Sequence, residues 1–287
     1  MPTSDVFAPP RIVTSTDDCY FYHTMEIPGH GLVKGEWDLR GGVDDYLAGV
    51  DLRGKRVLEI GTASGFLCFE MERRGAEVVA YDLSPDKGSW DLVPYPTSKS
   101  LATAESRRDH IRQLNNGYWF CHHALQSRAK VVYGSVYAVP EEIGRVDLST
   151  FGSVLLHVRD PFLALENTLR LTRETVVITD LSPRTESRVV RYLRKLPSGR
   201  RWLGDLLAPS MRFVPNFRTS RPEETWWRLQ PELITEFIGV LGFENVRIHA
   251  HQQTYKGRKV PLFTVVGRRT VPLDTQDQER PSLPRQW

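Results

Sequence analysis

Small residues and two carboxylates gather around one short stretch of the chain. Glu59 lies in an apolar run, and the small residues Gly61, Ala63 and Gly65 follow it directly. Asp82 comes seventeen residues after Gly65. Small side chains let a backbone approach a ligand closely, and a carboxylate at the end of the next strand can accept both hydroxyl groups of a ribose. This spacing indicates a nucleoside-binding turn.

The residues around the turn predict a strand, a tight turn, a helix and a second strand. The apolar run before the turn indicates a buried strand, and a helix is expected from Phe66 to Arg74. Gly75 suits the left-handed position that closes a helix. A second strand is expected from Glu77 to Tyr81, which places Asp82 at its tip. The N–H groups that begin the helix would face the same ligand.

The turn resembles the first motif of the class I S-adenosylmethionine-dependent methyltransferases, an acidic residue followed by Gly-x-(Gly/Ala)-x-Gly. The Gly-x-Gly-x-x-Gly pattern of dinucleotide folds is missing. The resemblance implies S-adenosylmethionine as cofactor, with its methionine part in the turn, its ribose on Asp82 and its adenine beside Ser135 and Val136. Many family members carry Asp where this chain has Ser135. The implied cofactor-binding residues are Glu59, Gly61, Thr62, Ala63, Gly65, Asp82, Leu83, Ser135, Val136, Phe151, Gly152 and Trp37.

Strands and helices alternate along the rest of the chain, which predicts a mostly parallel sheet. Further strands are expected at 131–133, 147–151 and 175–179, and closing strands at 246–248 and 262–266. The resemblance implies an α/β, Rossmann-like, seven-stranded sheet with helices on both faces. Ligands bind at the carboxyl ends of such strands, so the turn and Asp82 should border one crevice, with Asp180 at its rim.

The chain is expected to divide into five segments. They are a lid and arm (1–50), the cofactor-binding core (51–183), a cap inserted after the fifth strand (184–232), the C-terminal part of the core (233–269) and a flexible tail (270–287). Within the cap, a helix is predicted over 188–196. Within the core, the helix expected over 101–126 should break or bend at Asn115-Asn116-Gly117.

Aromatic residues in the lid and cap predict a closed pocket for a methyl acceptor. The alternative for the lid is that its aromatic rings only cover the edge of the sheet. The candidate substrate-binding residues are Tyr22, Arg40, Met211, Phe213, Trp226 and Trp227.

Two histidines are candidates for the catalytic base. Methyl transfer from a sulfonium is an in-line displacement, and a hydroxyl or ammonium acceptor must also lose a proton. His157, expected at the mouth of the crevice, is the first candidate, and His23 on the lid is the second. The alternative is that His157 only caps the loop before Pro161. An acceptor amine that is already neutral, or an acidic phenol, would need no base.

Composition excludes several classes of protein. Charged residues make up 25% of the 287 residues and hydrophobic residues 40%, as in ordinary globular domains. No run of apolar residues is long enough to span a membrane, and the N-terminus lacks a signal-peptide pattern, so a cytoplasmic location is expected. The three cysteines lie far apart without C-x-x-C spacing, and no metal site is expected.

Short motifs outside the turn narrow the resemblance. Trp37-Asp38-x-Arg40, Leu155-x-His157-x-x-x-Pro161 and the run from Trp226 to Phe243 resemble the wobble-uridine tRNA methyltransferase-like family and related small-molecule tailoring enzymes. Glu36 stands where the branch that uses a carboxylated donor has a basic residue. Because a carboxylate would repel that donor, ordinary S-adenosylmethionine is expected.

The resemblance leaves three functions open. The preferred one is methyl transfer to an oxygen or nitrogen of a small molecule, such as a secondary metabolite or a sugar-like acceptor. The second is tRNA methylation, because residues 184–221 hold ten Lys or Arg against two acidic residues and could bind phosphates. The third is an inactive scaffold, against which the intact turn and Asp82 argue. The oligomeric state is not predicted.

Overall fold

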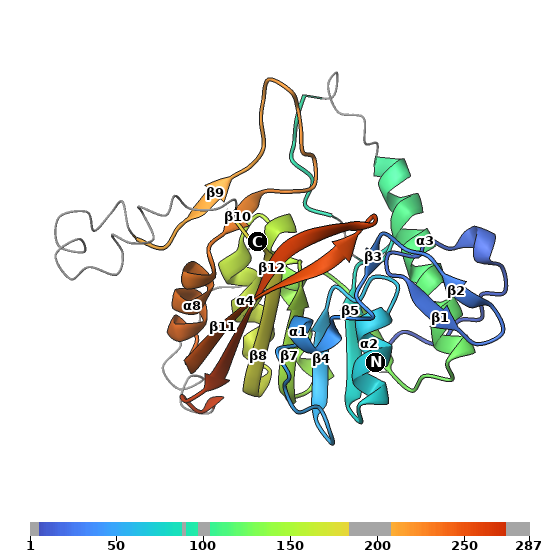
Figure 1. Cartoon of the computed structure of the whole chain (residues 1–287), viewed down its shortest axis with the longest axis horizontal. Coiled ribbons are helices and arrows are strands. Elements are labelled where there is room, and N and C mark those ends of the chain that lie inside the picture. The colour runs from blue at the N-terminus through green and yellow to red at the C-terminus, as the bar shows by residue number, and fades with distance from the viewer. Residues whose placement is uncertain (1–5, 88–89, 97–103, 184–207, 274–287) are drawn as a thin grey trace, which may run out of the picture.

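One large sheet organises the molecule (Figure 1). The computed structural model describes residues 6–87, 90–96, 104–183 and 208–273. Its main sheet has eight strands in the order β3-β11-β12-β8-β7-β4-β5-β6. In that order the strands are Trp37–Asp38, Phe243–Tyr255, Arg258–Arg269, Thr172–Leu181, Val146–Gly152, Arg56–Ile60, Glu77–Asp82 and Lys130–Tyr133.

The sheet confirms the Rossmann-like α/β prediction and corrects its strand count. Strands β8, β7, β4, β5 and β6 are parallel neighbours, and β12, β11 and β3 extend the sheet in antiparallel pairs. The eighth strand is β3, whose two residues pair with Thr254 and Tyr255 of β11. A strand of two residues has no periodicity that a sequence could show. The closing strands β11 and β12 are also much longer than expected.

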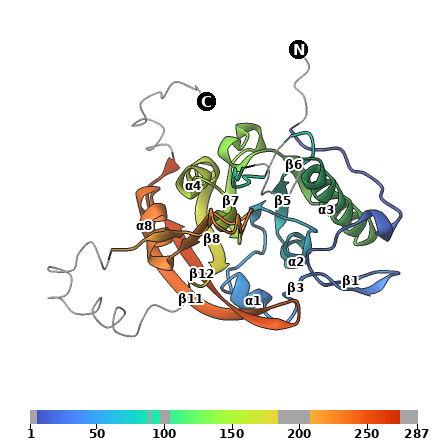
Figure 2. The ribbon, with the colours of Figure 1, turned by 90° about the horizontal axis from the view of Figure 1, so that it is seen from above.

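Helices cover both faces of the sheet (Figure 2). Helices α1 (Val43–Tyr46), α2 (Phe66–Arg73) and α3 (Ala104–Ala124) lie on one face, and α4 (Pro161–Leu169) and α8 (Pro231–Val240) lie on the other. Alternate strand residues point to opposite faces, so Val57 joins the core under α2 while its neighbour Leu58 joins the core under α4. Single turns of 3-10 helix occur at Thr16–Asp18 (η1), Val136–Ala138 (η2), Glu141–Ile143 (η3) and Leu155–His157 (η4).

Helix α3 is continuous, which corrects the predicted break at residues 115–117. Its glycine serves close packing instead, because a Cβ on Gly117 would lie 2.7 Å from the carbonyl oxygen of Tyr20. The buried Asn115 side chain donates a hydrogen bond of 3.1 Å to the carbonyl of Leu83. Both residues therefore anchor neighbouring segments rather than end the helix.

Two small hairpins lie outside the main sheet. Strands β1 (Met25–Ile27) and β2 (Gly31–Val33) form one in the N-terminal segment, and β9 (Met211–Phe213) and β10 (Trp227–Leu229) form the other in the cap. The helix predicted at 188–196 and most of the tail lie outside the described residues. Part of the N-terminal arm packs on the sheet, since the Ala8 N–H donates to the carbonyl of Val131 in β6. No helix in the described ranges is long and apolar enough to cross a bilayer.

Candidate active site

The turn after β4 has a backbone that requires small residues. Gly61 and Gly65 have φ angles of +79° and +89°, and even Ala63 is left-handed at +49°. A Cβ on Gly61 would lie 2.5 Å from Cγ2 of Val154, because the segment after β7 crosses directly over the turn. The glycine pattern predicted from sequence therefore has both a conformational and a packing cause.

Asp82 closes the turn from the tip of β5. Its Oδ2 accepts a hydrogen bond of 2.6 Å from the Ala63 N–H, and its Oδ1 accepts one of 2.7 Å from the Leu83 N–H. A carboxylate offers about four acceptor positions, so capacity for ligand hydroxyl groups is left over. Burial raises the pKa of Asp82 to about 6, while those two N–H groups favour the charged form.

Beside Asp82, two buried polar atoms at the same turn have no hydrogen-bond partner among the described residues. One is Oε2 of Glu59, which lies in β4 just before the turn and whose side chain is 3% exposed, and the other is Oγ1 of Thr62, which lies close enough to Glu59 to favour its charged form. Burial, with the neighbouring Asp82 carboxylate adding to it, raises the pKa of Glu59 to about 8. Buried polar groups are nearly always satisfied in native proteins, so these atoms indicate a polar or cationic ligand.

The residues after β6 border the other end of the turn. The Tyr81 hydroxyl donates a hydrogen bond of 2.8 Å to the Ser135 carbonyl. The Ser135 hydroxyl caps η2 by accepting from the Tyr137 N–H at 3.3 Å. Ser135 and Val136 thus follow β6, next to β5 and Asp82, as the resemblance implies, but the Ser135 side chain is engaged with its own backbone.

The N-terminal segment docks on the turn through its backbone. The N–H groups of Tyr22 and His23 both donate to Oγ of the buried Ser64, each at 3.1 Å. Trp37 lies in β3, the edge strand of the main sheet. Its Nε1 donates to the Tyr22 hydroxyl at 3.2 Å, and its ring packs on Tyr255. Trp37 is buried in the core of this segment, as the edge-covering alternative predicts.

The described part of the cap rests on the segment after β7. The Trp226 N–H donates to the carbonyl of Leu156, and Nε1 of Trp227 donates to the carbonyl of Arg159 at 3.0 Å. The Phe213 ring stacks edge-on against Trp227, with 5.5 Å between ring centroids. Three of the four predicted cap residues therefore contact one another, while the fourth, Met211, is 37% exposed on β9.

Both candidate histidines are neutral, His23 in a buried position and His157 in a half-buried one. Nδ1 of His157 lies 2.5 Å from the carbonyl oxygen of Glu224, which can only accept, so Nδ1 carries the proton. Burial, with the Arg228 guanidinium adding to it, lowers the pKa of His157 to about 4. Burial alone lowers the pKa of His23 to about 4. At neutral pH a base of such low pKa holds a transferred proton poorly.

The structure brings two further residues to this edge of the sheet. A Cβ on Gly152 would lie 2.9 Å from the Tyr46 hydroxyl, so the glycine after Phe151 leaves room for that group. Helix α1 is fixed there because the hydroxyls of Thr179 and Thr264 donate to the Tyr46 carbonyl. The other residue is Asp180, at the tip of β8. Its position followed from the strand pattern, whereas a four-residue helix gives no signal for Tyr46.

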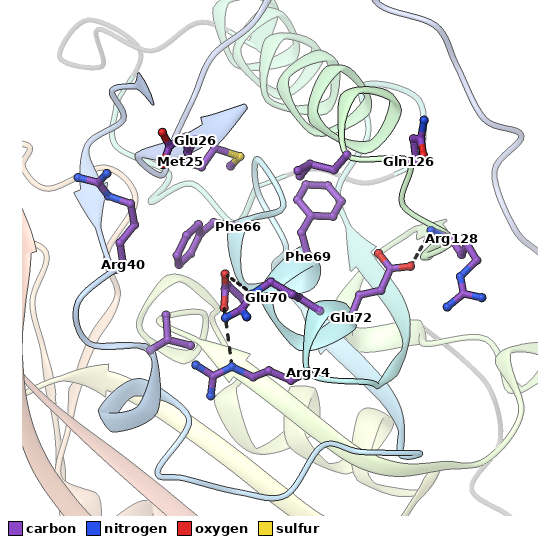
Figure 3. Close-up of a pocket in the computed structure, with 13 residues that line it drawn as sticks. Met25, Glu26, Arg40, Phe66, Phe69, Glu70, Glu72, Arg74, Gln126 and Arg128 are labelled. Atoms are coloured by element: carbon purple, nitrogen blue, oxygen red, sulfur yellow. Dashed lines mark hydrogen bonds and ion pairs between the residues drawn. The ribbon is translucent and has the colours of Figure 1, made fainter. Parts of the chain in front are cut away.

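Arg40 lies elsewhere. It forms an ion pair with Asp38 at 2.8 Å and lines a cavity of about 580 Å³ on the outer side of α2 (Figure 3). In that cavity Glu70 forms ion pairs with Arg73 and Arg74, and Glu72 accepts a hydrogen bond from the backbone N–H of Arg128. The cavity is not at the carboxyl ends of the parallel strands. Across the described residues, no cluster of His, Cys, Asp and Glu could hold a metal ion.

Comparison with known families shows which family the chain belongs to. A family model described as a methyltransferase domain matches residues 39–221, more than half of the chain. The chain belongs to this methyltransferase family. A search of curated proteins gave no significant match.

A solved structure shares the fold of this methyltransferase at low identity, and a second one is a weaker match. The N-terminal domain of EvdMO1, solved in the presence of S-adenosylhomocysteine (SAH) and D-fucose, is 17% identical. The match covers 86% of this chain and 90% of that one, with a TM-score of 0.51. A Burkholderia thailandensis 1,6-didemethyltoxoflavin-N1-methyltransferase, solved with its substrate and SAH, is 12% identical over 81% and 78% of the chains, with a TM-score of 0.46.

The cofactor of the methyltransferase is S-adenosylmethionine, and the site fits it. The unpartnered Oε2 of Glu59 can accept from the ammonium group of the methionine part. The glycine turn allows the close approach that this part needs, and Asp82 has acceptor capacity for the ribose. When bound, the cofactor supplies an electrophilic methyl group on a sulfonium.

Proposed function

We propose that this methyltransferase transfers the methyl group to an oxygen or nitrogen of a small-molecule acceptor. The acceptor would be a secondary metabolite or a sugar-like compound. The observation that carries the proposal is that the lid and the cap cover the carboxyl ends of the parallel strands. The lid is bonded to the turn at Ser64, and the cap is bonded to the segment after β7 at Leu156. Such a site suits an acceptor that can be enclosed.

The cap is linked to the core by more than one contact, which supports an enclosed pocket. The Arg107 guanidinium in α3 forms an ion pair with Glu224, and the Trp226 indole N–H donates to the carbonyl of Asp91. The Val93 N–H donates to the carbonyl of Glu223. Segments 90–96 and 221–228 therefore lie together above the strand ends, as Figure 1 also shows.

Within this proposal, aromatic residues would form the walls of the acceptor pocket. Tyr22 would contribute from the lid and Trp226 from the cap, with Trp227 and Phe213 packed behind. Enclosure would contribute to rate by holding the acceptor in line with the methyl group and by excluding water. Tyr46, whose hydroxyl lies above Gly152, would meet the acceptor from α1.

The test is a screen for product rather than for binding. The methyltransferase is incubated with S-adenosylmethionine and separate panels of phenols, free sugars and amines, and SAH and the methylated product are measured by mass spectrometry. Methylation of a small acceptor by the wild type, absent in Asp82→Ala, is the expected result. Bulk tRNA is tested beside them at two salt concentrations. Methylation of tRNA alone, with binding that falls steeply as salt rises, would overturn the proposal.

A further inference from the structure

The strand ends divide into two halves with different tasks. Strands β4, β5 and β6 carry the glycine turn, Asp82 and Ser135, which together account for the cofactor. Strands β7 and β8 end beside the cap and the first turn of η4. An acceptor in line with the methyl group has to lie over this second half. Its polar side chains are therefore the ones that can take part in the transfer.

Asp180 is a buried carboxylate in this second half with spare capacity. It is the second-last residue of β8 and is 2% exposed. Its Oδ1 accepts a hydrogen bond of 2.6 Å from the Leu181 N–H. Its Oδ2 is buried without a hydrogen-bond partner within the described ranges. A buried carboxylate oxygen without a partner is costly to folding, which favours a functional reason for it.

We propose that Asp180 accepts the proton that the acceptor releases during methyl transfer, an inference that rests on the proposed function. The acceptor then carries its proton on the reacting atom, as a hydroxyl group or an ammonium does. An ammonium first gives its proton to Oδ2, which leaves a lone pair on nitrogen, whereas a hydroxyl can lose its proton as it reacts. The lone pair of the nitrogen or oxygen then forms the new bond to carbon, and the carbon–sulfur bond breaks with its electrons going to sulfur. The proton goes to Oδ2 of Asp180 and then to solvent.

The charged groups around Asp180 suit this exchange. Arg228 faces it from cap strand β10, and the Leu156 N–H faces it from η4; both favour the carboxylate. The phenol of Tyr46 lies near it from α1 and stays neutral, because burial raises the pKa of that hydroxyl. Burial outweighs the favourable groups and raises the pKa of Asp180 to about 7, where a group can both take up and release a proton.

Asp180 is better matched to this role than His157. The histidine has a pKa of about 4, and its Nδ1–H donates a hydrogen bond to the cap carbonyl of Glu224. His157 therefore holds the cap through this hydrogen bond. The nearby Arg228 guanidinium further disfavours its protonated form. The proposal assigns proton transfer to the carboxylate and leaves His157 a positioning residue that acts through the cap.

The experiment compares Asp180→Asn with the wild type and with Asp51→Asn, which removes an exposed carboxylate near the opposite ends of the strands. Calorimetry with SAH comes first. If the wild type does not bind SAH, the cofactor site itself is wrong. The expected result is a dissociation constant within about twofold of wild type for both variants, with thermal melts confirming that both fold.

Two readouts then test Asp180 itself. In an infrared pH titration of the wild type, Asp180 should ionise near neutral pH beside Asp82 and Glu59, whose pKa values are also raised, so its band is read from the difference between the wild type and Asp180→Asn. That band should be missing in Asp180→Asn and should shift to higher pH in Arg228→Gln, since the opposite charge is removed. With phenol, primary-alcohol and primary-amine probes, Asp180→Asn should lose about 100-fold or more in kcat for any methylated alcohol or ammonium. Asp51→Asn should match the wild type.

Two outcomes would overturn the proposal. One is a titration in which Asp180 ionises below about pH 5, whatever the probes do. The other is an Asp180→Asn variant that binds SAH normally and keeps wild-type kcat on an alcohol or ammonium probe. If the wild type methylates none of the probes, the infrared titration alone decides whether the proposal for Asp180 stands or is overturned.

Discussion

The Ala63 N–H lies 2.6 Å from Oδ2 of Asp82, so the turn after β4 and the tip of β5 are joined by a hydrogen bond. One oxygen of Asp82 thereby supports the turn, and the carboxylate as a whole faces the cofactor site. The same group has a structural and a binding task, and substitutions there should affect both.

Asp82→Ala should weaken the binding of SAH by about 10- to 100-fold, because hydrogen bonds to a charged group contribute about 1.5–3 kcal/mol. Isothermal titration calorimetry measures the change. Asp86→Ala, an exposed carboxylate on the following loop, is the control and should bind as the wild type does. Unchanged affinity in Asp82→Ala would refute the assignment of this residue to the ribose.

Gly61→Ala should reduce both stability and SAH affinity. The new Cβ would lie 2.5 Å from Val154, and the backbone would be strained at a φ of +79°. Gly54→Ala separates the two effects, because Gly54 has a φ of +70° but an added Cβ there would have no atom within 4 Å. The strain alone costs about 1 kcal/mol. Urea unfolding should show a larger loss for Gly61→Ala, partly restored when Val154→Ala is added.

Ser64→Ala should loosen the lid. It leaves two N–H groups, those of Tyr22 and His23, without their acceptor, at a cost of about 1–3 kcal/mol for each buried donor. Hydrogen exchange at these two amides should accelerate at least tenfold, while exchange in β4 stays slow. Ser15→Ala, which removes an acceptor at the exposed start of η1, provides the comparison and should leave both amides protected.

His157→Ala should release the cap without affecting the cofactor. The variant loses the bond from Nδ1 to the Glu224 carbonyl, and hydrogen exchange over residues 222–229 should increase. His157→Asn can still donate to that carbonyl and should restore part of the protection. SAH affinity should stay within about twofold of wild type in both. Unaltered exchange in the alanine variant would show that the cap is held by its other contacts.

Glu59 should make stability depend on pH. Its folded pKa is raised to about 8 from an ordinary value of 4.5, so the folded state binds the proton more tightly. Its contribution is therefore fully present below about pH 4.5 and is lost progressively as pH rises from there through 8, by up to about 5 kcal/mol. Unfolding free energies of the wild type and Glu59→Gln should run parallel below about pH 4.5 and diverge progressively between pH 4.5 and 8. Curves that stay parallel over the whole range would contradict this.

The parts of the site that the sequence predicted depend on local pattern. The glycine turn and Asp82 belong to consecutive elements, and a strand–turn–helix–strand unit brings them together whatever the rest of the chain does. The order of parallel strands likewise follows from the regular alternation of strands and helices. His157 follows β7 directly, whereas its bond to Glu224 depends on a cap segment sixty-seven residues away.

What the sequence missed depends on packing between distant segments. Gly117 looked like a helix break, yet it is a contact surface for the carbonyl of Tyr20. Strand β3 exists because Trp37 and Asp38 meet the end of β11, more than two hundred residues later. The unpartnered oxygen of Asp180 is a property of burial, which no residue type reveals by itself.

Ser64 lies in the glycine turn after β4, and its hydroxyl oxygen accepts hydrogen bonds from the N–H groups of two lid residues, Tyr22 and His23. Hydrogen bonds weaken steeply with misalignment, so even a slight displacement of the turn would be felt by both amides at once. Binding of the cofactor at the turn and docking of the lid on Ser64 are therefore expected to be coupled.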